Sequence, residues 1–136
     1  MIDEALQDHC LSDATLRRLV ADRIYPDFAP ASAAVPYILR SRLSNPPHDH
    51  LGGEAAIASP TFQFTVVAAS SKQRNEVADA LRSTLSRYSG PMGTDDVEVS
   101  SPEEADDLES AADGSERRLF VRRLDFEVWH SKEPAR

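Results

Sequence analysis

The clearest pattern in the sequence is a regular alternation of apolar and polar residues over residues 119–130. The apolar positions are Phe120, Leu124, Phe126 and Val128, and the charged positions between them are Arg123, Asp125 and Glu127. Successive side chains of a strand point to opposite faces of a sheet, so this period of two is typical of a half-buried strand. The pattern predicts a strand over residues 117–130.

Three shorter segments also have the character of strands. Residues 35–43 form one, in which Pro36 fits only at the start of the strand or on a sheet edge because proline has no N–H to donate. Alternation at residues 62, 64 and 66 predicts a second, and Val97 and Val99 mark a third.

Two short helices are predicted at the N-terminus. Ile2, Leu6 and Cys10 stand four apart and form one apolar stripe. Ser12 is the expected N-cap of the second helix, whose apolar positions run from residue 16 to residue 24. The prolines at 26 and 30 end this helix, and residues 26–34 are a connector.

A longer amphipathic helix is predicted after residue 70. Ser70 and Gln73 form a capping box, in which the two side chains satisfy free backbone N–H groups reciprocally. Apolar residues then follow at helical spacing: Val77, Leu81, Leu85 and Tyr88. The pair at residues 90 and 91, Gly-Pro, is the expected end of the helix.

These elements predict an α+β fold in a single domain over residues 1–136. The fold is a single layer of about four mostly antiparallel strands, covered by helices on one face. Residues 44–60 are rich in turn formers and predict a long flexible or partner-binding loop. Residues 95–116 are an acidic excursion, within which residues 102–112 suggest a short helix capped by Ser101, with Leu108 as its one large apolar residue.

Charge is concentrated in that excursion. The formal net charge of the chain is −8, and residues 95–116 hold ten carboxylates and neither lysine nor arginine. DNA binding through phosphates needs clustered basic residues, so sequence-specific DNA binding is disfavoured. We expect neither a signal peptide nor a membrane span, because no apolar run is long enough. A single cysteine favours folding in a reducing cytoplasm.

Candidate chemistry is sparse. His48 and His50 stand two apart and could share a metal, but they lie among prolines and glycines and lack further ligands, so a solvated loop is favoured. Cys10 beside His9 suggests a nucleophile and its base, yet adjacent helical residues point about 100° apart, so Cys10 is interpreted as core. Nucleotide-binding and hydrolase motifs are missing, and we expect no cofactor.

The acidic excursion has several interpretations. Its central carboxylates are Glu103, Glu104, Asp106, Asp107 and Glu109. They can form a solvated face, a surface for a partner, or a surface that repels DNA. Arginines at 117, 118, 122 and 123 could instead draw the segment back onto the protein or onto an adjacent subunit.

Several segments together resemble the tail-completion, or tail-terminator, family of long-tailed bacteriophages and phage-derived particles. They are residues 16–26, 29–30, 35–39, 62–64, 76–81 and 124–129. The combination of Asp-Arg-Ile-Tyr-Pro (22–26), Val-Pro-Tyr (35–37) and Phe-Glu-Val-Trp (126–129) carries most of the resemblance. Recurring family positions match Arg23, Tyr25, Pro36, Tyr37 and Trp129, interpreted as structural or interface residues, with Arg23 as a partner for a carboxylate. The acidic excursion is not part of the resemblance.

The resemblance implies a structural virion protein without catalytic residues, made in the host cytoplasm. It implies a homo-oligomeric, typically hexameric ring that caps the tail tube, joins the tube protein to the head–neck connector or stopper, and lets DNA pass through its lumen without specific binding. The five central carboxylates are hypothesised to line that lumen. Three alternatives stay open: another head–tail neck or stopper protein, a cytoplasmic acidic protein-binding module of the regulatory or immunity type, and a hydrolase using His48 and His50.

Overall fold

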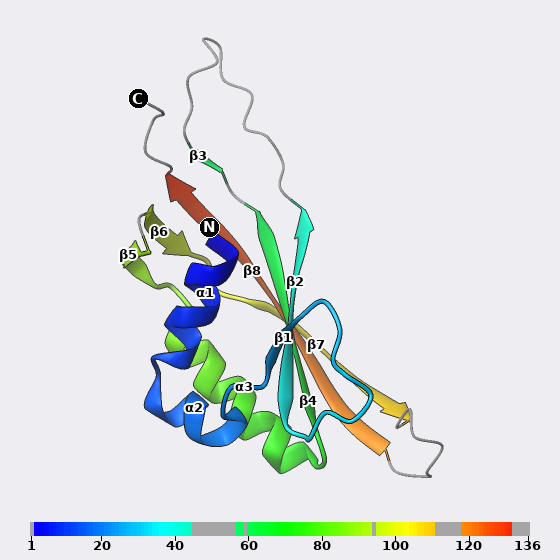
Figure 1. Cartoon of the computed structure of the whole chain (residues 1–136). Coiled ribbons are helices and arrows are strands. Elements are labelled where there is room, and N and C mark those ends of the chain that lie inside the picture. Colours follow the sequence, from blue (N-terminus) through cyan, green and yellow to red (C-terminus); the bar gives the residue numbers. More distant parts are fainter. Residues whose placement is uncertain (1, 45–56, 59, 94, 111–117, 132–136) are drawn as a thin grey trace.

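The structure is a computed structural model, and it describes residues 2–44, 57–58, 60–93, 95–110 and 118–131. Within these residues the chain forms a mixed α+β fold (Figure 1). The helices are α1 Ile2–Leu11, α2 Ala14–Val20 and α3 Ser71–Leu85. The strands are β1 Ile24–Pro26, β2 Tyr37–Ser44, β3 Ile57–Ala58, β4 Thr61–Ala68, β5 Ser89–Met92, β6 Asp95–Val99, β7 Glu103–Ser110 and β8 Arg118–Ser131. No helix among the described residues is long and apolar enough to cross a membrane.

The sheet is organised around β8, the strand that the C-terminal alternation predicts (Figure 1). The main path through the sheet is β1-β2-β4-β8-β6-β5, and β3 and β7 also pair with β8. Among the strand pairs of the described residues, β1 and β2 are parallel and all others are antiparallel. On the edge of β8 that faces away from β4, β7 pairs with residues 118–125 and β6 pairs with residues 128–131. The two acidic strands therefore follow each other along one edge of β8.

The core lies between the helices and one face of the sheet, which we call the inner face. Helix α3 packs on β4 and β8, and α1 and α2 pack on α3. Phe62 and Phe64 of β4 and Leu124 and Phe126 of β8 are fully buried there. The rings of Phe64 and Phe126 meet edge to face at a centroid distance of 5.8 Å. The alternate apolar side chains of β4 and β8 thus form the core, as the sequence pattern predicts.

The first helices differ in detail from the prediction. Asp13, not Ser12, caps α2: its carboxylate accepts a hydrogen bond from the Leu16 N–H at 2.8 Å. Helix α2 ends at Val20, because the left-handed backbone of the next residue turns the chain away. Ile24 was expected on this helix, but it begins β1 and is buried from there.

The start of α3 follows the sequence more closely than its end does. The Ser70 hydroxyl accepts a hydrogen bond from the Gln73 N–H at 3.1 Å. The Gln73 side chain accepts one from the Ala69 N–H at 2.8 Å, one residue before the cap. The expected end at residues 90 and 91 is wrong, because α3 stops at Leu85 and those residues belong to β5.

The largest error concerns residues 102–112, where a short helix was expected. Residues 103–110 instead form β7, which pairs along its whole length with β8. A segment with one large apolar residue gains little from helix packing, whereas β8 offers a row of backbone hydrogen-bond partners. The described part of the acidic excursion is therefore two strands and not a loop. Within the described residues the sheet has eight strands, where about four were predicted.

Candidate functional site

The acidic strand β7 presents its carboxylates on two opposite faces of the sheet. In the ladder, Glu104 lies opposite Leu124 and Asp106 opposite Arg122, positions on the inner face of β8. Glu103 and Asp107 have the other parity and lie on the outer face, the face away from the helices. The backbone register also places Glu109 at an outer-face position, but its side chain is outside the described part of the structure. The five carboxylates predicted as one surface are therefore divided between two.

The inner carboxylates are held by arginines from α3. Arg82 donates to both oxygens of Glu104, at 3.0 Å from Nε and 2.7 Å from Nη2. Arg74 Nη2 lies 3.7 Å from the Asp106 carboxylate. The two arginines are eight residues apart on one helix, so they can lie along the same side of it.

An arginine of β8 completes this inner cluster. Arg122 donates to both oxygens of Asp106, at 2.6 Å from Nε and 3.1 Å from Nη2, and lies 3.9 Å from Glu104. We call Glu104, Asp106, Arg74, Arg82 and Arg122 the β7 clamp. The cluster corresponds to the alternative in which arginines draw the acidic segment back onto the protein.

The contacts of the clamp shift the pKa values of Asp106, Arg82 and Arg122. The hydrogen bonds from Arg122 lower the pKa of Asp106, and the same contact raises the pKa of Arg122. Hydrogen bonds to Glu104 and then to Asp79 raise the pKa of Arg82. These shifts favour the charged forms of Asp106, Arg82 and Arg122, and both inner carboxylates lie in ion pairs with arginines.

The outer carboxylates have fewer partners. Arg123 Nη1 lies 3.7 Å from Asp107, and Glu103 lies opposite Asp125 in the ladder. All β7 side chains that the structure describes are exposed, from Glu103 to Leu108. The charge of β7 that is open to a partner is therefore mainly on the outer face.

The residues predicted as structural or interface positions fall into two groups. Arg23 donates to the carbonyl oxygens of Pro36 at 3.0 Å and Leu19 at 3.5 Å, so it holds backbone groups where a carboxylate partner was expected. The rings of Tyr25 and Tyr37 meet edge to face at 5.9 Å. These residues, with the buried Pro36, fasten the start of β2 to the segment around β1.

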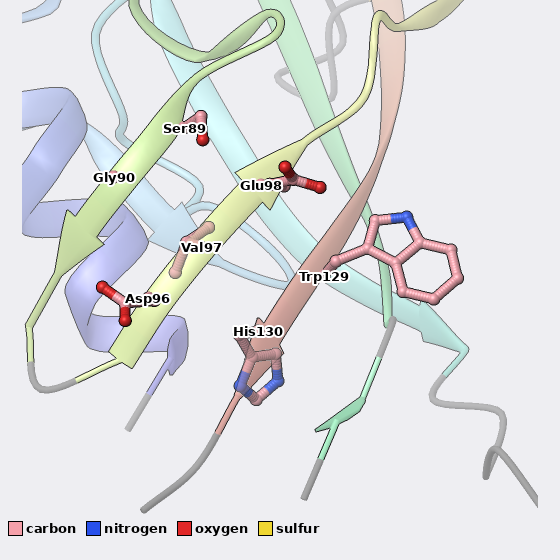
Figure 2. A pocket seen from close by; sticks show the side chains of 7 residues that line it. All are labelled: Ser89, Gly90, Asp96, Val97, Glu98, Trp129 and His130. Atoms are coloured by element: carbon pink, nitrogen blue, oxygen red, sulfur yellow. The ribbon is translucent and has the colours of Figure 1, made fainter. Parts of the chain in front are cut away.

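Trp129 differs from that group because it faces outward. It is 38% exposed on the outer face of β8, next to the buried Val128 and His130. It contributes to a shallow hollow of about 350 Å³ between β5, β6 and β8 (Figure 2).

The pair His9 and Cys10 does not form a nucleophile and base. Cys10 is fully buried on the apolar stripe of α1, and burial raises the pKa of its thiol to about 12. The rings of His9 and Tyr88 meet at a centroid distance of 4.4 Å, tilted by 58°, and His9 Nε2 donates a hydrogen bond to the Thr84 carbonyl oxygen at 3.2 Å. The interpretation of Cys10 as a core residue is confirmed.

The predicted histidine pair at residues 48 and 50 lies outside the described residues. Among the residues that the structure does describe, no three His, Cys, Asp or Glu side chains gather as a metal site. The groups that distinguish this surface are paired ions, outward carboxylates and an exposed tryptophan. An α+β sheet with such a surface is suited to contacts with other macromolecules.

Comparison with known proteins identifies the family. Residues 4–131 match the family described as Tail completion protein gp17, and the chain belongs to this family. It is therefore a structural protein of a phage-type tail, which agrees with the resemblance seen in the sequence. No curated protein matches the sequence.

Among solved structures, the fold is similar to that of a chain in the virion of a native gene transfer agent particle. The TM-score is 0.60 at 17% sequence identity, and the match covers 96% of this chain and 92% of the other. At 17% identity this similarity shows that the two chains share a fold.

Proposed function

We propose that this protein assembles into a homo-oligomeric ring, hexameric as in the tail-terminator resemblance, that caps the tail tube and joins it to the head–neck connector. The observation that carries the proposal is the family match, which spans nearly the whole chain, residues 4–131. The fold likeness to a chain of a gene transfer agent virion supports it, because that chain also belongs to an assembled particle.

The shape of the sheet suits a ring subunit. A closed ring needs two different surfaces on each subunit, so that each copy binds the next in the same orientation. Here the helices cover the inner face of the sheet (Figure 1), and Trp129 on the outer face is 38% exposed. Phe28, which follows β1 at the opposite edge of the sheet, is 79% exposed. Such exposed aromatic residues are typical of subunit contacts.

Passage of DNA gives the acidic strands a role within this proposal. Carboxylates that face the lumen repel phosphates and keep DNA from sticking to the wall. Glu103 and Asp107 suit that role best, because they lie on the outer face. Glu104 and Asp106 suit it less, because the arginines of the β7 clamp balance their charge.

The test is assembly of the purified full chain, alone and mixed with the tube protein of the same particle. We expect a ring of about six copies by native mass spectrometry, and ring-capped tubes by electron microscopy. A chain that stays monomeric in both conditions, or that only binds a basic protein one to one, contradicts the proposal and favours an acidic binding module.

A second experiment addresses the lumen. The variant Glu103→Gln with Asp107→Asn should form normal rings but slow DNA ejection from assembled particles. Loss of ring formation in this variant would instead show that these carboxylates lie in a subunit contact.

A further inference from the structure

The outer face of the sheet carries an aromatic and acidic surface at the end formed by β5, β6 and β8 (Figure 2). The ladder places Ser89 opposite Glu98, and Glu98 opposite Trp129, so the three side chains form one row across the sheet. Asp96 lies in the next row and is exposed, as Glu98 is. We call Ser89, Asp96, Glu98 and Trp129 the Trp129 face.

The Trp129 face has the make-up of a protein contact. Tryptophan is among the residues that contribute most to interface energies, because its large ring gains much by leaving water. Beside it, the small Ser89 and Gly90 leave the hollow of about 350 Å³, which can accept side chains of a partner.

The charge of the face specifies a basic partner. Neither Asp96 nor Glu98 forms an ion pair with any residue in the described part of the chain, in contrast to the carboxylates of the β7 clamp. Among the residues that the structure describes, no ion pair neutralises these two carboxylates, so they can bind a guanidinium group of a partner. Arginine also stacks on an indole ring, and its planar group binds carboxylates through two hydrogen bonds.

The chain itself carries a matching pair of arginines in its helix layer, on the other side of the sheet. Arg17 and Arg18 are adjacent and exposed on α2, and neither forms an ion pair with a described residue. Arg18 also borders a hollow that contains Asp13 and Asp79, so Arg17 is the more available of the two. Helix α2 packs on α3, which covers the inner face of the sheet. The sheet therefore separates these arginines from the Trp129 face of the same copy.

We propose that α2 of one copy docks on the Trp129 face of a second copy, with Arg17 and Arg18 against Glu98, Asp96 and the indole of Trp129. This inference rests on the proposed ring, and it names the contact that builds it. The two surfaces are different, so the contact repeats head to tail and can close. It also places the helix layer of one copy against the outer sheet face of the next, so that helices lie on both faces of the sheet in the ring.

The test is a charge exchange in the full chain. Glu98→Arg alone, and Arg17→Glu with Arg18→Glu, should each raise the dissociation constant between subunits by about tenfold or more. Combining the three substitutions should restore assembly to within about threefold of the unmodified chain, because the opposite charges meet again. Lys72→Glu, a reversal at an exposed position of α3, is the control and should assemble normally. Native mass spectrometry measures the subunit equilibrium, and circular dichroism confirms that each variant is folded.

The outcomes separate this inference from the ring itself. If the unmodified chain forms rings and the single reversals assemble equally well, the contact is wrong and the ring stands. If the reversals disrupt rings and the combination does not restore them, the two surfaces are not partners. If rings form but Glu98→Arg loses binding to the tube protein, the Trp129 face belongs to the tube contact, and self-docking is wrong. A chain that is monomeric under every condition overturns both proposals.

Discussion

Removing the two inner carboxylates of β7 tests what holds this strand on the sheet. In the structure Glu104 and Asp106 each accept two hydrogen bonds from one arginine, with four distances between 2.6 and 3.1 Å. None of the described β7 side chains belongs to the buried core. The strand is therefore held by its backbone ladder and by charge, and the variant Glu104→Gln with Asp106→Asn removes the charge alone.

The expected loss of stability follows from how exposed the two arginine–carboxylate pairs are. The Arg122 side chain is 17% exposed and that of Asp106 is 45%, so solvent weakens their attraction. A bidentate arginine–carboxylate pair at this exposure contributes about 0.5–1 kcal/mol to stability, at the upper end for surface pairs. Losing both pairs should then cost about 1–2 kcal/mol, which raises the equilibrium for detachment of β7 by about 5- to 30-fold.

Hydrogen exchange measures this detachment directly. Amides of residues 103–110 should exchange faster by that factor in the variant. The control is Glu103→Gln with Asp107→Asn, which makes the same chemical changes on the outer side of the same strand. Asp107 has one arginine contact, at 3.7 Å, so the control should change exchange by about twofold or less. Equal acceleration in both variants, or in neither, would refute the role of the clamp.

The clamp should also depend on pH in a defined direction. Arg122 lowers the pKa of Asp106 from its ordinary value of 3.8. A carboxylate with a lowered pKa in the folded state stabilises the fold above its unfolded pKa. That contribution should be complete at neutral pH and lost as the pH falls below about 4, through the lowered pKa. A carboxyl titration by NMR should show a midpoint below 3.8 that rises in Arg122→Gln, and an unchanged midpoint in that variant would contradict the assignment.

Three further outcomes follow from burial and capping. Phe126→Ala should lower the free energy of unfolding by about 3–5 kcal/mol in urea, because the ring is fully buried, whereas Phe28→Ala should change it by less than about 0.5 kcal/mol. Ser70→Ala should cost about 1 kcal/mol through loss of the α3 cap, and Ser71→Ala, one residue further, should cost clearly less. Cys10 should resist iodoacetamide at pH 8 in the native protein and react in urea, since only roughly one thiol in ten thousand ionises at a pKa of about 12; rapid native labelling would show that α1 opens.

Much of the fold could be predicted from local periodicity. The strands β2, β4, β6 and β8 and the helices α1 and α3 each have an alternation or a stripe that depends only on neighbouring residues. The cap at Ser70 follows in the same way, from a hydroxyl placed before a helical stripe. These features depend only on residues that are close together in the sequence, so they can be predicted without knowing the fold.

The elements that were missed depend on distant partners. β1 has three residues and exists because β2 accepts it in parallel, and residues 90 and 91 join β5 because β6 pairs with them. β7 has no apolar alternation at all, so its strand form is determined by β8. Arg74 and Arg82 could not be assigned to the acidic segment either. Their partners follow from the register of β7, and a shift of one residue would move Glu104 and Asp106 to the other face.

That register bears on how the acidic segment can act. Because Glu104 and Asp106 are balanced by arginines, the ten carboxylates counted in the sequence overstate the charge that a partner meets. In the described part of the chain, carboxylates without an ion pair lie on the outer face along one edge of β8, from Glu103 on β7 to Glu98 on β6 beside Trp129. A strand of 14 residues spans about 45 Å, so the two ends of this edge can serve different neighbours. The Trp129 end has the aromatic anchor that a subunit contact needs, whereas the β7 end has exposed charge without an anchor, which suits a wall along which DNA passes.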